Sequence, residues 1–403
     1  MASPERPAPH LSLQTAEPTP LGSGFLSGLL SAILGIAGFG AVLCLRFPEY
    51  LTFADLRPFY ALGYLRGIIH LTLVTSFLLG TVSAFLRANK MLALVGIGFT
   101  LAAALLGGSQ VPVDGEVSGR SWLGVDFFVL NLLLYSAVFV PLERLFALRA
   151  EQPVFRRQWP VDLTYFFVNS LLIEVLTIVT LKPALILFAW ARPGWFVGTL
   201  PLIVQVPALL LIADFTQYWI HRTFHAVSFL WPFHAIHHSV EEMDWLAGSR
   251  LHLVDVIVTR GLVYVPIFVL EFSERALMIY VFLVAAQATF IHANVRWEFR
   301  PLRRLVATPA FHHWHHSADR EAVDKNFAVH TPIWDILFGT YYLPERWPSS
   351  YGLSGRRDVP SRWLTQLVYP FRRRQLGDDA HAASRRSGGR ESEQGSPRAK
   401  PLG

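Results

Sequence analysis

The chain has 403 residues, of which 52% are hydrophobic, 13% aromatic and 16% charged, and its formal net charge is +6. Soluble domains carry about 25% charged residues, so this composition excludes a disordered protein, a coiled coil and a nucleic-acid binder with a broad basic face. The single cysteine, Cys44, excludes an intramolecular disulfide and a cysteine-ligated metal site. The composition therefore favours an all-α chain that crosses a bilayer several times.

Both ends of the chain differ from this apolar pattern. Residues 1–23 are rich in Pro, Ser and Thr and lack the basic start and short apolar core of a secretory signal, so we expect a disordered tail. Residues 372–403 are basic and low in complexity. We expect them to form a second disordered tail, whose positive charge lies near anionic lipid.

Apolar runs long enough to cross a membrane begin at residue 24. Six are predicted as transmembrane helices, at 24–45, 68–86, 91–107, 123–142, 162–181 and 200–220. Two more, at 252–271 and 276–293, are separated by a short polar linker, which predicts a helical hairpin.

The charges of the loops predict how these helices are oriented, because Lys and Arg accumulate on the cytoplasmic side. The 87–90 loop carries two basic residues and the 144–160 loop carries four, whereas the intervening 108–122 loop carries one. This alternation predicts a cytoplasmic N-terminus and places the chain after residue 220 on the cytoplasmic face, at the inner membrane if the protein is bacterial. The three arginines of the 46–67 loop do not fit the alternation.

Histidine is concentrated in one part of the chain: 12 of the 15 histidines lie between His221 and His330. They form one H-x-x-x-H box and two H-x-x-H-H boxes. On a helix, residues three or four apart share a face, whereas the middle histidine of H-x-x-H-H is rotated about 100° from its neighbour. One such box can therefore supply ligands to two metal ions. The eight box histidines are His221, His225, His234, His237, His238, His312, His315 and His316.

A solvated loop or hydrogen-bonded core histidines would explain one isolated histidine better than a metal does. Three boxes in one chain favour a metal centre instead, although imidazole suits Fe, Zn, Cu and Ni alike. The chain has no Glu-x-x-His pair and no H-E-x-x-H motif, which disfavours a carboxylate-bridged di-iron bundle and a zincin peptidase.

The boxes and their flanks resemble the fatty acid hydroxylase/sterol desaturase superfamily of membrane oxygenases. The similar segments are DFTQYWIHRTFH (214–225), LWPFHAIHHS (230–239), HANVRW (292–297) and TPAFHHWHHS (308–317). The resemblance implies an all-α membrane protein whose cytoplasmic histidine-box cap holds a di-metal centre of two iron ions. It implies the eight box histidines as ligands, with His292 as a ninth. Arg296 stands where the fatty acid 2-hydroxylases of the superfamily carry another histidine, which favours the sterol desaturase branch.

The resemblance is dense over residues 200–345, which we predict to be the catalytic domain. N-terminal transmembrane helices would occupy 24–199, and 346–371 would be a C-terminal extension. Metal-bound imidazoles commonly donate their second N–H to a carboxylate or carbonyl. We predict such supporting roles for Asp214, Asp244, His252 and His330. The resemblance leaves His252 open as a further ligand, and His330 stays open as a structural residue.

These features predict a membrane-bound, O₂-dependent di-iron oxidoreductase that hydroxylates or desaturates an unactivated C–H of a sterol or fatty-acyl lipid in lipid biosynthesis. The chain has no H-P-G-G haem signature, so we expect electrons from a separate cytochrome b5 or ferredoxin type of donor. No nucleic-acid partner is expected. The alternatives are an ether-lipid-cleaving monooxygenase of the same superfamily, a histidine-rich metal transporter, and a non-catalytic membrane scaffold. A transporter would place its ligands near mid-membrane on broken helices, and a scaffold would not need complete boxes.

Overall fold

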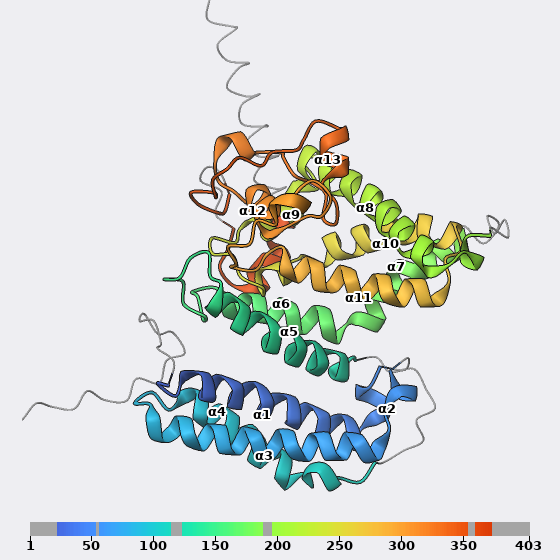
Figure 1. The fold of residues 1–403 in the computed structure, drawn as a ribbon. Coiled ribbons are helices and arrows are strands. Elements are labelled where there is room, and N and C mark those ends of the chain that lie inside the picture. The colour runs from blue at the N-terminus through green and yellow to red at the C-terminus, as the bar shows by residue number, and fades with distance from the viewer. Residues whose placement is uncertain (1–21, 54–55, 114–122, 188–195, 354–358, 373–403) are drawn as a thin grey trace, which may run out of the picture.

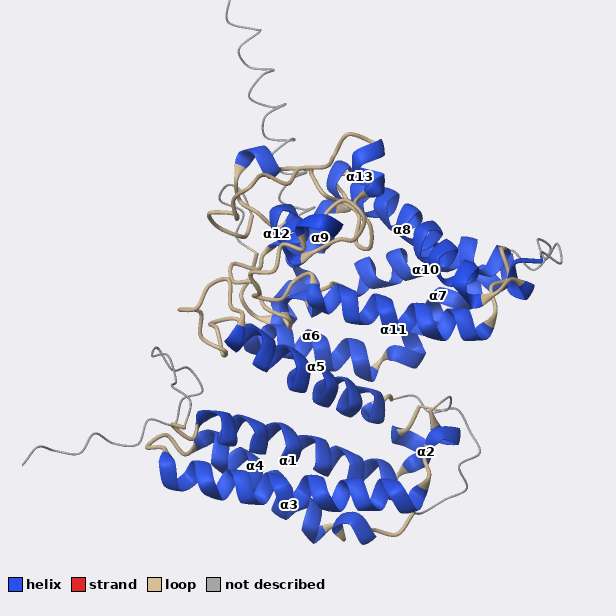
Figure 2. Ribbon diagram, viewed as in Figure 1, coloured by secondary structure: helices blue, strands red, loops and turns tan. Residues whose placement is uncertain are grey.

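The computed structural model describes residues 22–53, 56–113, 123–187, 196–353 and 359–372. The two predicted tails, 1–23 and 372–403, lie outside these ranges except for their inner ends. Over the described residues the regular structure is helical, and the only β pairing is two isolated bridges (Figure 2). The prediction of an all-α fold is confirmed.

The N-terminal helices pack as a layer of their own (Figure 1). In it α1 (Phe25–Arg46) contacts both α3 (Leu62–Leu86) and α4 (Met91–Leu105), and the short α2 (Pro48–Leu51) lies at one end. Small residues let these helices approach closely: a Cβ atom at Gly35 would lie 2.5 Å from the carbonyl oxygen of Gly96. The Ser31 hydroxyl donates to the carbonyl of Ser76 at 2.7 Å. Such contacts are typical of helices that pack in a membrane.

A second group of helices holds the histidine-rich part of the chain. It contains α5 (Val125–Leu145), α6 (Trp159–Leu171), α7 (Ile173–Leu187), α8 (Leu202–Ala226), α10 (Leu253–Val269) and α11 (Glu274–Phe290). Helix α5 packs against α1, and α10 packs against both α7 and α8. Leu209, Phe224, Val263 and Tyr280 are buried in the core between α8, α10 and α11. Helices from both sides of residue 200 pack together, since α7 lies along α10, and the predicted domain boundary there stays a prediction.

Among the described residues, five helical segments are long and apolar enough to cross a membrane: Phe25–Arg46, Leu62–Leu86, Met91–Gln110, Val125–Leu145 and Leu202–Ala226. The predicted single span over 162–181 is wrong, because the chain breaks there into α6 and α7 of 13 and 15 residues. The two halves follow different neighbours, since α6 packs beside residues 247–249 and α7 along α10. Helices α10 and α11, of 17 residues each, are joined by a short linker as predicted, but each packs against α8, and packing of the two helices on one another as a hairpin stays a prediction.

The boxes lie at the end of α8 and on two short helices, α9 (Trp231–His238) and α12 (Pro309–His315), close to α13 (Ile333–Leu337). Thr308 begins α12: its hydroxyl accepts the N–H of Phe311, and Pro309 occupies the first turn. The chain after residue 345 folds back over the boxes. There Tyr351 Oη lies 2.8 Å from His313 Nδ1, and the carbonyl of Leu367 lies 3.1 Å from His252 Nε2.

Candidate metal centre

All nine histidines singled out from the sequence come together in two groups. In each group, every histidine offers one ring nitrogen within 4.8 Å of the others. The first group is His221, His225, His234, His238 and His315, and the second is His237, His292, His312 and His316. All are buried except His225, which is half-buried.

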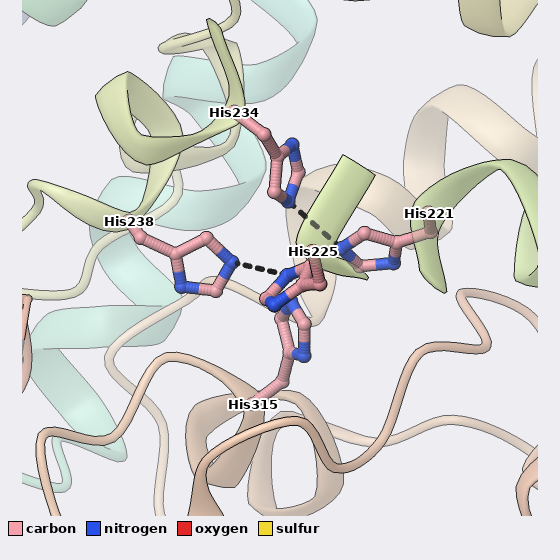
Figure 3. A group of neighbouring side chains, drawn as sticks. All are labelled: His221, His225, His234, His238 and His315. Carbon is pink, nitrogen blue, oxygen red and sulfur yellow. Dashed lines mark hydrogen bonds between the residues drawn. The ribbon is translucent and has the colours of Figure 1, made fainter. Parts of the chain in front are cut away.

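The first group is built by three helices whose rings converge (Figure 3). Helix α8 supplies His221 and His225, α9 supplies His234 and His238, and α12 supplies His315. The Nε2 atoms of His221 and His234 lie 2.9 Å apart, and those of His225 and His238 lie 3.1 Å apart.

The second group takes the remaining histidine of α9, the histidines at the two ends of the α12 box, and His292, which follows α11. The Nε2 atom of His292 lies 3.3 Å from that of His237 and 3.0 Å from that of His312. Each H-x-x-H-H box is thus divided between the groups, with its outer pair in one and its middle histidine in the other. This is the division that helical spacing predicts.

Backbone carbonyls fix which ring nitrogen carries the proton. The Nδ1 atoms of His221 and His315 face the carbonyls of Phe327 and Lys325 at 2.7 and 2.8 Å. The Nδ1 atoms of His237 and His292 face the carbonyls of residues 250 and 288 at 3.2 and 2.7 Å. Because a carbonyl oxygen can only accept, each Nδ1 carries the hydrogen and each Nε2 presents a lone pair.

Two carboxylates hold further rings in the same way, and sequence reasoning missed both. Asp255 Oδ2 lies 2.7 Å from His234 Nδ1, and Asp324 Oδ1 lies 3.2 Å from His225 Nδ1. The sequence feature that could have identified Asp255 is its position in the first turn of an apolar helix, shortly after the first two boxes.

Lone pairs therefore face lone pairs inside both groups. His221 faces His234 across 2.9 Å, and His237 faces His292 across 3.3 Å, with no proton left to share between the two nitrogens. The buried Nε2 of His315 has no hydrogen-bond partner among the described residues. Such an arrangement fits a cation between the rings, and neutral imidazole nitrogens are ligands for iron, zinc, copper and nickel. The residues thus fit two transition-metal ions, one in each group.

Burial keeps these imidazoles neutral. Desolvation lowers the pKa of His292 to about 4 and, together with the neighbouring rings, lowers the pKa of His234, His237, His238, His312, His315 and His316 well below the usual range. At neutral pH each ring therefore has one N–H and keeps one nitrogen lone pair for a metal.

Asp214 does not bond to an imidazole, contrary to the prediction. Its carboxylate instead accepts the backbone N–H groups of Val329, His330 and Thr331 at 2.8–2.9 Å. Asp335 similarly accepts the N–H groups of residues 327 and 328, each at 2.8 Å. The two buried carboxylates fix the 327–331 loop, whose first carbonyl orients His221. Asp214 therefore influences the centre indirectly, by fixing the backbone loop whose carbonyl orients His221.

The other three predicted supporting residues also make no hydrogen bond to a histidine of either group. Asp244 binds the Arg156 guanidinium in a buried network that includes Asp162 and Arg250. His252 caps α10 by accepting the N–H of Val254 at 3.1 Å. His330 Nδ1 lies 3.2 Å from Gln287 Oε1. Of these, only the Asp244 network reaches the centre indirectly, because the carbonyl of its member Arg250 faces His237.

A cavity of about 400 Å³ leads to the histidines. It is walled by α5, α6, α8, α10 and α11, mainly through apolar and aromatic side chains such as Phe166, Phe224 and Val284. His221 and His234 of the first group and His237, His292 and His312 of the second reach its wall. Both groups thus face a space suited to an apolar chain.

Comparisons with known proteins agree with this geometry. Residues 206–340 match the family model of the fatty acid hydroxylases. The chain is 35% identical to ornithine lipid hydroxylase OlsE of Rhizobium tropici over 177 residues, which are 43% of this chain and 52% of the relative. It is 32% identical to alkylglycerol monooxygenase of Homo sapiens over 128 residues, 32% of this chain and 28% of the relative. No solved structure matches the chain.

A sterol desaturase is also among the relatives: Delta(7)-sterol 5(6)-desaturase ERG3A of Gibberella zeae is 26% identical over 143 residues, 36% of this chain and 39% of the relative. The chain spans about half the length, or less, of these curated relatives. The predicted resemblance to the superfamily is confirmed over residues 206–340, whereas the preference for its sterol desaturase branch stays a prediction.

Proposed function

Because residues 206–340 belong to the fatty acid hydroxylase family, we propose that this chain is a membrane-bound oxidoreductase that hydroxylates or desaturates an unactivated C–H of a lipid. Two iron ions, one in each histidine group, would supply the activation of O₂ and the removal of hydrogen. The observation that carries the proposal is the cavity, because it brings an apolar chain against histidines of both groups.

The residues of this chain have three tasks in that reaction. Carbonyls and carboxylates hold the Nδ1 protons, so that Nε2 lone pairs remain directed inward. Apolar walls exclude water from the histidines. The cavity holds one segment of the lipid next to them, which decides the position that is oxidised.

Cleavage of an ether lipid is the second candidate. It is favoured by the alkylglycerol monooxygenases of Homo sapiens and Danio rerio, at 32% and 28% identity. A metal transporter is disfavoured, because most of the box histidines lie on α9 and α12, which are short helices and not among the five candidate spans.

Lipidomics of cells that express the chain would test this function. We expect a lipid that gains one oxygen or loses two hydrogens with the wild-type chain and stays unchanged with His237→Ala, at equal amounts of membrane-inserted protein. Loss of an alkyl chain from an ether lipid would favour the second candidate. Identical lipid profiles for the two chains would contradict both.

We also propose that the histidine centre faces the cytoplasm and that a separate cytochrome b5 or ferredoxin type of protein supplies electrons there. The loop charges support this orientation. Glu241, just after α9, is exposed, whereas the single native cysteine is buried. A Glu241→Cys variant should therefore react with a membrane-impermeant maleimide only after the cells are opened. Labelling of intact cells would contradict the orientation.

A further inference from the structure

A positively charged side chain lies in the cavity wall, and none of the described residues supplies a counter-ion for it. Arg260, in the middle of α10, lines the cavity together with neutral and apolar side chains. Within the described part of the chain it has no ion pair and no hydrogen bond. Its guanidinium stays protonated at any working pH. An intramembrane or cavity charge of this kind indicates a functional site.

Arg260 belongs to the face of α10 that turns toward the cavity. The α10 residues in the wall recur at helical spacing, as pairs one turn apart: Asp255 and Val256, Thr259 and Arg260, Val263 and Tyr264. Asp255 marks the metal end of this face, because it bonds to His234. Arg260 lies five residues further, about 7.5 Å along the helix axis.

No cavity-lining group among the described residues neutralises this charge. Among the described residues of the wall the only carboxylate is Asp255, which is already bonded to His234 and to the Thr259 hydroxyl. The imidazoles of the wall carry no negative charge. A second polar atom is also unpartnered there: the buried Oδ1 of Asn169 has no hydrogen-bond partner within the described residues. The cavity therefore presents a guanidinium fork and a hydrogen-bond acceptor to its occupant.

We propose that Arg260 binds the carboxylate or phosphate of the substrate, so that the cavity selects lipids with an anionic group over neutral ones. Guanidinium pairs with either group through two parallel hydrogen bonds, and the pairing strengthens where water is excluded. The acceptor of Asn169 suits a hydroxyl or N–H of the bound lipid. That the bound lipid is a substrate rests on the proposed function, whereas its negative charge rests on Arg260.

Binding to the purified full-length protein tests this directly, with radiolabelled dodecanoate, dodecyl phosphate and dodecanol as probes. The wild-type protein should bind one or both anions at least about tenfold more tightly than dodecanol. Arg260→Gln should lose this preference and keep its affinity for dodecanol. Dodecanoate and dodecyl phosphate distinguish a carboxylate substrate from a phosphate one. Equal wild-type affinity for all three probes would overturn the inference.

Two controls separate recognition of the anion from a structural role. Arg275→Gln removes an exposed arginine from the start of α11, the next helix along the chain, and should leave all three affinities unchanged. Removing an unpaired charge from an apolar wall should raise the melting temperature of the ligand-free protein in Arg260→Gln. A lower melting temperature with an unchanged anion preference would overturn the inference. If Arg260→Gln does not fold, Arg260→Lys should keep a preference for anions.

The inference and the proposed function fail in different ways. Oxidation of a neutral lipid at equal rates by the wild-type and Arg260→Gln proteins would overturn the inference and leave the function standing. A tenfold preference for anions, in a protein that oxidises no lipid, would support the inference and contradict the function.

Discussion

Asp255 accepts a hydrogen bond from the Nδ1 atom of His234 across 2.7 Å. The carboxylate therefore holds the ring with its Nε2 lone pair directed at His221. Thr259 donates to the other carboxylate oxygen at 3.1 Å, so the carboxylate itself is held in place. The first turn of α10 thus sets the tautomer and the direction of one predicted ligand in the first histidine group.

Asp255→Asn tests this support. The amide keeps the shape but loses the negative charge, so metal affinity should fall by about 10- to 100-fold. Competition with a chromogenic chelator measures the affinity. Asp319→Asn is the matched control, because Asp319 pairs with Arg346 away from the centre and should have no effect. Equal affinities of the Asp255 variant and the wild type would contradict the assigned role.

Removing the Asp214 carboxylate should destabilise the fold as well as the centre. Three backbone N–H groups would lose their acceptor, and a buried unsatisfied donor costs about 1–3 kcal/mol. Asp214→Ala should therefore lower the free energy of unfolding by at least about 2 kcal/mol and lower the metal content. Thermal denaturation in detergent measures the first effect. Asp214→Asn keeps one acceptor oxygen and should therefore lose less free energy of unfolding than Asp214→Ala. A larger loss in Asp214→Asn than in Asp214→Ala would argue against this account.

The two histidine groups should lose metal independently. His315→Ala removes a member of the first group and His237→Ala a member of the second, so each variant should retain about one metal ion per chain. His313→Ala is the matched control from the same box, because its Nδ1 bonds to Tyr351 and it belongs to neither group. It should retain both ions. Complete metal loss in both single variants would contradict two separate sites.

Acid should weaken the centre. Burial lowers the pKa of His292 to about 4, against about 6.5 in an unfolded chain, so the folded state binds fewer protons at intermediate pH. The stabilisation of the folded state relative to the unfolded chain that neutral His292 provides is fully present above about pH 6.5 and is lost as the pH falls toward 4. Protons also compete with metal for the same lone pairs. The melting temperature and the metal content should both fall between about pH 7 and pH 5, and a metal content that rises on acidification would refute this.

Sequence alone predicted the parts of this molecule that depend on periodicity. Helices α10 and α11 follow from two apolar runs with a short linker, and the division of each box between two groups follows from the spacing of His234, His237 and His238. Both are local properties of a helix, which the order of residues determines directly.

The features that sequence reasoning missed depend on contacts between distant segments. Helix α6 ends at the turn residue Leu172, where the chain stops packing beside residues 247–249 and begins to pack along α10. No residue type in the sequence marks that break. Asp214 was expected to bond to an imidazole because it lies two turns before His221. Its carboxylate instead accepts backbone N–H groups of the 327–331 loop. The charge of Arg260 becomes informative only when the described residues around it are seen to supply no free carboxylate.

The metal content of the purified full-length protein tests the central claim most directly. After anaerobic reconstitution with ferrous iron and removal of unbound metal, elemental analysis should give two iron ions per chain, one for each histidine group. Fewer than one ion per chain, in protein that is folded and membrane-inserted, would contradict the di-metal account.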